Sequence, residues 1–122
     1  MIEFRYNSEE DIIYLERSGD ISLQDVLSCI NSINQNFQSL QKLHIIDDLR
    51  HSVSTFKKEE YPVMINELKK RVNRYNQVKH AVIVNNPSDT ALTILFAMKS
   101  KSIENYSFKI FSTIEAAKYW LK

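Results

Sequence analysis

Two short apolar runs constrain the fold of this chain most strongly. Residues 43–47 read Leu-His-Ile-Ile-Asp, and residues 78–84 read Val-Lys-His-Ala-Val-Ile-Val. Short runs rich in β-branched residues are typical of strands that other elements cover on both faces. Such strands occur in parallel sheets whose successive strands are joined by helices, and the sequence therefore predicts an α/β fold.

The period of the apolar residues places the remaining elements. Ile2, Phe4 and Tyr6 alternate with polar residues, and a second strand over 12–18 follows a short polar turn and ends at Gly19-Asp20, so an N-terminal hairpin is expected. Helical spacing predicts four helices, at 22–37, 62–75, 88–99 and 112–121. Alternation of apolar and polar residues predicts one last strand at 106–111. The expected order is ββαβαβαβα. It describes one domain over 1–122 with a single mixed, mostly parallel sheet of about five strands.

Capping residues mark three of the helix starts. Ser22 precedes Asp25 by three residues, and Ser112 precedes Glu115 by the same spacing, which is the pattern of a capping box. Asn86-Pro87 combines a preferred cap with a proline suited to the first helical position. Pro62 must lie in the first turn of its helix or kink it, because an interior proline loses a hydrogen bond and clashes.

Composition excludes several classes of function. The chain has one glycine, which cannot build a glycine-rich phosphate cradle, and its formal charge of +1 argues against a dedicated nucleic-acid binder. Cys29 is the only cysteine, and neither a signal peptide nor an apolar run long enough to span a bilayer occurs. We expect a cytoplasmic domain without a disulfide or a transmembrane segment.

Catalytic and metal sites find little support in the sequence. His44, Asp47, Asp48 and His51 are suitable metal ligands, but His44 and Asp47 point to opposite faces of a strand, and carboxylates beside Arg50 are more often ion-paired. No G-x-S-x-G motif exists for a hydrolase, and Cys29 lies within a helix, where a small inert residue is expected. We therefore expect no enzyme, no metal and no cofactor.

One composite anion or regulatory site is conceivable. In a parallel sheet, the segments after Asp47 and after Val84 lie at the same edge, and each leads toward a helix N-terminus that suits an anion. The predicted members of this site are Arg50, Ser52, Ser54, Asn86 and Ser88. The alternative is two ordinary capped helices. Lys69-Lys70-Arg71 and Arg74 likewise complement a helix C-terminus rather than form a binding patch.

The helix predicted over 88–99 is too apolar for one amphipathic face. It is either buried on two sides or exposes a patch to another molecule, in which case self-association would use Leu92, Leu95 and Phe96.

The chain closes with the segment Phe111-Ser112-Thr113-Ile114-Glu115-Ala116-Ala117-Lys118-Tyr119-Trp120-Leu121. This segment and the order of the elements resemble the STAS domain, which is SpoIIAA-like, and its CRAL-TRIO lipid-binding relatives. Members often end in a similar F-x-x-x-E-A-A-x-x-W-L pattern. The resemblance implies a phosphorylatable serine where the strand after the first helix ends. Residues 47–55 lack the Asp-Ser pair and the glycine of that site, so only Ser52, Ser54 and Thr55 could take the role.

Two functions follow as expectations. The first is a non-enzymatic STAS-like regulatory or protein-interaction domain, with an unidentified protein partner or a homodimer, contacting through the loop 48–55, the second helix and the helix 88–99. The alternative is a carrier or sensor for a small lipid-like or anionic ligand. A ligand binder needs a cavity of roughly several hundred Å³, whereas an interaction domain should be close-packed.

Overall fold

Five strands form one mixed sheet whose spatial order, β1-β2-β3-β4-β5, follows the chain. The computed structural model describes residues 1–122, and its strands are β1 (Ile2–Asn7), β2 (Ile12–Ile21), β3 (Lys42–Ser54), β4 (Gln77–Ile83) and β5 (Tyr106–Phe111). Strands β1 and β2 are antiparallel, and every other neighbouring pair is parallel. The predicted fold class and the ββαβαβαβα order are therefore confirmed.

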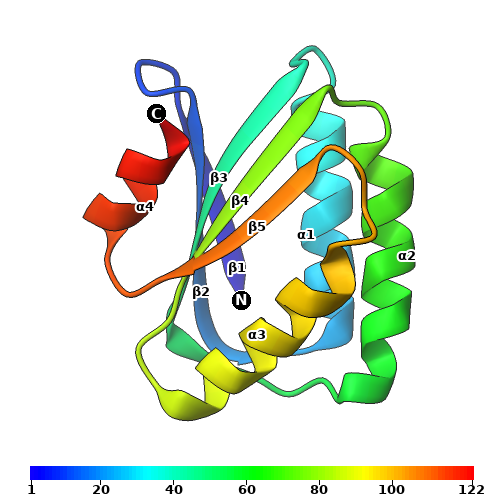
Figure 1. The fold of residues 1–122 in the computed structure, drawn as a ribbon, viewed down its shortest axis with the longest axis vertical. Helices are drawn as coiled ribbons and strands as arrows, with labels where there is room; N and C mark the ends of the chain where they lie inside the picture. Colours follow the sequence, from blue (N-terminus) through cyan, green and yellow to red (C-terminus); the bar gives the residue numbers. More distant parts are fainter.

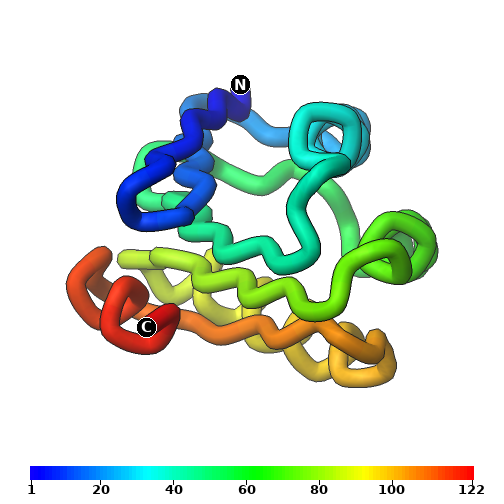
Figure 2. The backbone as a smooth tube through the Cα atoms, turned by 90° about the horizontal axis from the view of Figure 1, so that it is seen from above, coloured from blue at the N-terminus to red at the C-terminus, as the bar shows by residue number.

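Helices cover both faces of this sheet, but unequally. The helices are α1 (Leu23–Asn36), α2 (Tyr61–Val72, preceded by a 3₁₀ turn), α3 (Pro87–Ser100) and α4 (Ile114–Leu121). Helices α1, α2 and α3 lie on one face, and α4 lies alone on the other (Figures 1 and 2). We call the first the three-helix face. No helix is both long and apolar enough to cross a membrane.

The helix starts show which capping predictions hold. Ser22 and Asp25 form the predicted capping box, and the Asn86 side chain accepts a 2.8 Å hydrogen bond from the Asp89 backbone amide. Pro62 lies in the first turn of α2. The predicted cap at Ser112 is wrong, because α4 begins one residue later and Thr113 Oγ1 accepts from the Ala116 amide at 3.2 Å.

The largest difference from the sequence prediction is the length of β3. The strand continues to Ser54, so the segment 48–54 is not the predicted loop. It is held by the end of β2, whose residues Ser18–Ile21 pair with His51–Ser54, and β2 therefore does not end at Gly19-Asp20. The C-terminal ends of β2 and β3 form a two-stranded parallel ribbon. This ribbon extends past β4, because the pairing of β4 with β3 stops at Asp48.

Gly19 lets β2 continue through an irregularity. The register between β2 and β3 shifts between Glu16 and Ser18, and Gly19 follows with φ of +69°. Residues with a Cβ rarely adopt this conformation, so the backbone dihedral angle favours glycine here. Steric crowding is not the reason, because an added Cβ would meet nothing within 4 Å.

Gly19→Ala should therefore lower the free energy of unfolding by about 1–2 kcal/mol through backbone strain alone. Gly19→Asn should lose less, since asparagine tolerates positive φ better. Urea unfolding of the three proteins measures both effects. Equal stability of the wild type and Gly19→Ala would show that the ribbon does not depend on this conformation.

Candidate functional site

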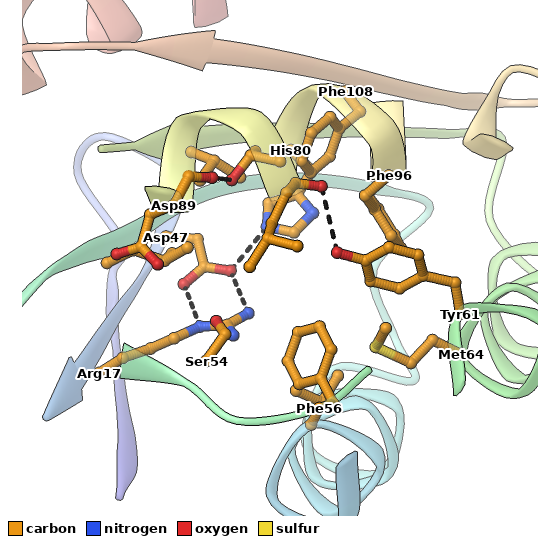
Figure 3. Close-up of a pocket in the computed structure, with 15 residues that line it drawn as sticks. Arg17, Asp47, Ser54, Phe56, Tyr61, Met64, His80, Asp89, Phe96 and Phe108 are labelled. Carbon is orange, nitrogen blue, oxygen red and sulfur yellow. Dashed lines mark hydrogen bonds and ion pairs between the residues drawn. The ribbon is translucent and has the colours of Figure 1, made fainter. Parts of the chain in front are cut away.

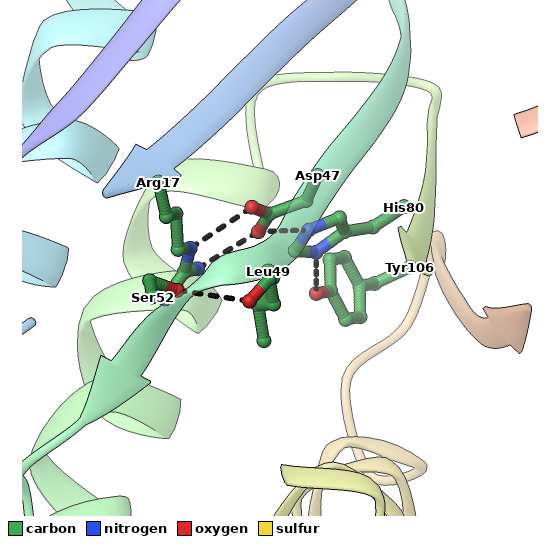
Figure 4. Close-up of polar contacts among 6 residues, drawn as sticks. All are labelled: Arg17, Asp47, Leu49, Ser52, His80 and Tyr106. Atoms are coloured by element: carbon green, nitrogen blue, oxygen red, sulfur yellow. Dashed lines mark hydrogen bonds and ion pairs between the residues drawn. The ribbon is translucent and has the colours of Figure 1, made fainter. Parts of the chain in front are cut away.

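Four polar side chains, one from each of four neighbouring strands, form a row across the three-helix face (Figure 4). The row consists of Arg17 on β2, Asp47 on β3, His80 on β4 and Tyr106 on β5. Arg17 donates to both carboxylate oxygens of Asp47, from Nε at 2.9 Å and from Nη2 at 2.8 Å. His80 Nε2 lies 2.9 Å from Asp47 Oδ2, and the Tyr106 hydroxyl lies 2.6 Å from His80 Nδ1.

The register of the strands places these residues on one diagonal. Leu15 lies opposite Asp47, and Arg17 is two residues further along β2. Asp47 in turn lies opposite Val82, two residues beyond His80. Even spacings keep side chains on the same face of a strand, and long side chains can reach diagonal neighbours. The same step joins His80 to Tyr106, because Phe108 is the residue opposite His80.

Hydrogen bonds engage both ring nitrogens of His80. Burial, and then the nearby charge of Asp47, raise the pKa of Tyr106 well above its ordinary value, so its hydroxyl stays protonated. The hydroxyl lies 2.6 Å from His80 Nδ1, and His80 Nε2 lies 2.9 Å from Asp47 Oδ2. Both ring nitrogens are then occupied.

Asp47 is ionised despite being completely buried. Burial by itself would raise the pKa of Asp47, but the charge of Arg17 and the hydrogen bonds from His80 and Arg17 outweigh it and hold the pKa far below its usual range. A buried carboxylate is tolerated when it is paired and hydrogen-bonded. No buried side-chain nitrogen or oxygen in the structure lacks a hydrogen-bond partner.

A cavity of about 70 Å³ lies between this row and helix α3 (Figure 3). Its aromatic wall consists of Phe56, Tyr61, Phe96 and Phe108, and neighbouring rings contact edge to face with centroids 5.7, 6.2 and 4.9 Å apart. Polar side chains line the opposite side, namely Arg17, Asp47, Ser54, His80 and Asp89, and Thr93 also lines the cavity. The cavity therefore has an aromatic side and a polar side. We call it the α3 cavity.

A second cavity, of about 80 Å³, lies on the other side of the row, under α1 and α2. Its lining is mainly aliphatic, and Arg17, Val26, Asp47 and His80 line both cavities. Cys29 also lines the second one, where burial raises the pKa of its thiol to about 12. The thiol is therefore protonated at neutral pH and is a poor nucleophile.

The five residues of the predicted anion site do not converge. Arg50 lies on the α4 face, where Nε and Nη2 donate to Asp48 at 2.9 and 2.8 Å. Ser52 is buried and donates to the Leu49 carbonyl, while Ser54 lines the α3 cavity on the opposite face from Arg50. Asn86 is occupied as a helix cap, and Ser88 is exposed. The strand that replaces the predicted loop separates these groups.

The other predicted residues have simpler positions. Thr55 is exposed and donates to the Ile21 carbonyl, and phosphorylation of Ser52, Ser54 or Thr55 stays a prediction. Leu92, Leu95 and Phe96 pack against the protein's own core, so the large exposed residues of α3 are instead Ile94 and Met98. No group of three or more potential metal ligands is present.

Sequence reasoning missed Arg17, His80 and Tyr106, although a signal existed. Each is in phase with inward apolar neighbours on its strand, as in Ile13-x-Leu15-x-Arg17 and Val78-x-His80-x-Val82. One polar residue in an inward position is common, but with Asp47 the four successive strands β2 to β5 each carry one, which predicts mutual pairing.

Comparisons with known proteins support the fold. An uncharacterized protein of the DUF3478 family from Shewanella loihica PV-4, described as having a SpoIIAA-like fold, is similar with a TM-score of 0.67 and 11% sequence identity. The similarity covers 100% of this chain and 93% of that protein. No protein-family model and no curated protein matches the sequence. The fold is thus SpoIIAA-like, as the sequence resemblance predicted.

Asp47→Asn should lower the free energy of unfolding by about 3–5 kcal/mol, because it leaves the charge of Arg17, whose side chain is only 11% exposed, without a counter-ion. Asp48→Asn is the matched control, since Asp48 pairs with Arg50 at the same distance of 2.8 Å but nearer the solvent. We expect the control to lose about 1 kcal/mol or less. Urea unfolding measures both, and equal losses would contradict a special role for the buried pair.

Proposed function

We propose that this protein is a non-enzymatic, STAS-like domain that binds a small molecule in the α3 cavity. The observation that carries the proposal is the shape of that cavity, which has aromatic walls on one side and a cluster of polar groups on the other. Apolar cavities with a few convergent polar groups are the usual form of small-molecule sites.

The bonding of the polar row supports binding over catalysis. A general base needs a free atom within reach of the proton that it removes. His80 has none, because Asp47 and Tyr106 occupy its two nitrogens, and Asp47 already accepts three hydrogen bonds. Ser54 lies in the same cavity, but neither His80 nor Asp47 has a free atom to activate its hydroxyl.

The volume of the cavity limits its ligand. An engineered cavity of about 150 Å³ holds benzene, so a cavity of about 70 Å³ accommodates only a few non-hydrogen atoms. This is below the several hundred Å³ expected for a carrier of larger ligands. The volume therefore favours a sensor of small molecules over a carrier of long-chain lipids.

Binding of propan-1-ol, followed by ¹H–¹⁵N NMR, tests this proposal. We expect saturable shifts at the amides of cavity residues, because the hydroxyl can reach the polar groups while the propyl chain contacts the aromatic wall. Val26→Leu should abolish these shifts by filling the space, since Val26 lines both cavities.

Val63→Leu makes the same change on the exposed face of α2, where Val63 is 46% exposed, and should leave propanol binding intact. If the wild-type protein shows no saturable shifts, or if Val26→Leu binds propanol as well as Val63→Leu does, the cavity is not a binding site.

A second candidate function is protein contact through the outer surface of α3. Ile94 and Met98 are 48% and 62% exposed and lie four residues apart, which places them side by side on the helix. The inner surface of the same helix contributes Leu92, Thr93 and Phe96 to the cavity. A ligand beneath α3 and a partner above it would therefore act on one element.

Light scattering of the purified protein tests whether this surface joins two copies of the chain. Self-association through α3 predicts a dimer for the wild type and a monomer for the double variant Ile94→Ser, Met98→Ser, because polar residues remove the apolar contact. Lys101→Ser, on an exposed residue just past the same helix, is the control and should remain dimeric. A monomeric wild type at high concentration rules out the homodimer.

A further inference from the structure

The charges around the α3 cavity restrict the class of molecule that it can bind. Arg17 and Asp47 are paired, so their charges cancel at short range. Asp89 is a second buried carboxylate in the wall, and its side-chain partner is the neutral Asn86, whose Nδ2 donates at 2.8 Å. The polar side of the cavity therefore carries two carboxylates and one guanidinium.

Hydrogen-bonding groups remain free on this polar side. Arg17 uses Nε and Nη2 to bind Asp47, and its Nη1 makes no hydrogen bond within the protein. The Ser54 hydroxyl also lacks a partner within the protein, and Ser54 lines the same cavity as Arg17. Asp89 accepts from Asn86 through Oδ2, and no side chain occupies its Oδ1. Two donors and one acceptor can therefore face a ligand.

The free hydrogen-bonding groups favour an uncharged ligand over an ionised one. A carboxylate could accept from Arg17, but Asp47 already neutralises that charge, Asp89 adds repulsion, and the ligand supplies no donor for Asp89. An ammonium could donate to Asp89, but it supplies no acceptor for the free donors of Arg17 and Ser54. An uncharged group that both donates and accepts can pair with all three.

We propose that the α3 cavity is a site for a small uncharged molecule with a short apolar body and a carbonyl group, of which an aliphatic primary amide is the best match. The carbonyl oxygen accepts from Arg17 Nη1 and Ser54 Oγ, and the amide nitrogen donates to Asp89. The short alkyl chain lies against the aromatic rings. The assignment rests on the proposed function, because it names the ligand class of that same cavity.

Three probes of similar size and different charge test the assignment. Propionamide and propionate have nearly the same shape, and propylammonium supplies the opposite charge. Titration of the protein, followed by ¹H–¹⁵N NMR, should give saturable shifts with propionamide. Propionate and propylammonium should each bind at least about tenfold more weakly.

Two variants connect the selectivity to named side chains. Ser54→Ala should weaken propionamide about two- to tenfold, the effect of one hydrogen bond, whereas Ser28→Ala on the exposed side of α1 should have no effect. Asp89→Asn keeps the shape of the side chain and removes a negative charge, so it should strengthen propionate binding. Thermal unfolding of each variant confirms that it is folded.

The outcomes separate the two proposals. If propionate or propylammonium binds more tightly than propionamide, the cavity is a binding site but the uncharged-ligand assignment is wrong. If none of the three probes binds and propan-1-ol also fails, the proposed function itself is overturned. Binding of propionamide that is unchanged in both Ser54→Ala and Val26→Leu would place the ligand elsewhere and would overturn the assignment.

Discussion

The pairing of Asp47 with Arg17 is the interaction on which the rest of the structure depends. A completely buried carboxylate must be matched by a positive charge and by hydrogen bonds to its remaining lone pairs. Arg17 supplies the charge from one neighbouring strand, and His80 supplies a further bond from the other. Strand register is thereby constrained, because a slip by one residue would turn Asp47 away from both partners and toward the α4 face.

This requirement also accounts for the position of the cavities. Apolar side chains in a core can repack to fill space, whereas the members of the row are held in place by directional bonds. The space on each side of the row must then be filled by the helices alone, and two voids of similar size remain, of about 70 and 80 Å³. The same bonds that stabilise the sheet therefore leave room for a ligand beside a charged and polar surface.

Much of the fold could be predicted from the sequence, because its determinants are local. The Ser22–Asp25 capping box, the Asn86-Pro87 helix start and the alternation from Tyr106 to Ile110 each depend on neighbours only a few residues apart. The extension of β3 could not be predicted in this way, since Asp48, Arg50 and Ser52 are typical of a loop. The side chain of Arg50 forms an ion pair with Asp48, and the segment pairs as a strand with β2, which lies more than thirty residues away in the chain. The candidate site was missed for the same reason, because each of its members has an ordinary local context and its partners are on other strands.

The sequential order of the strands has a consequence for how the chain folds during synthesis. Each strand from β2 onward pairs with the strand that precedes it, so no strand has to wait for a later one before it can join the sheet. Arg17 leaves the ribosome before Asp47, and His80 and Tyr106 follow in that order. The carboxylate therefore meets its guanidinium as soon as β3 is added to β2, and each later strand adds one further hydrogen bond to a charge that is already neutralised. A nascent sheet built in this order never has to enclose an unpaired Asp47.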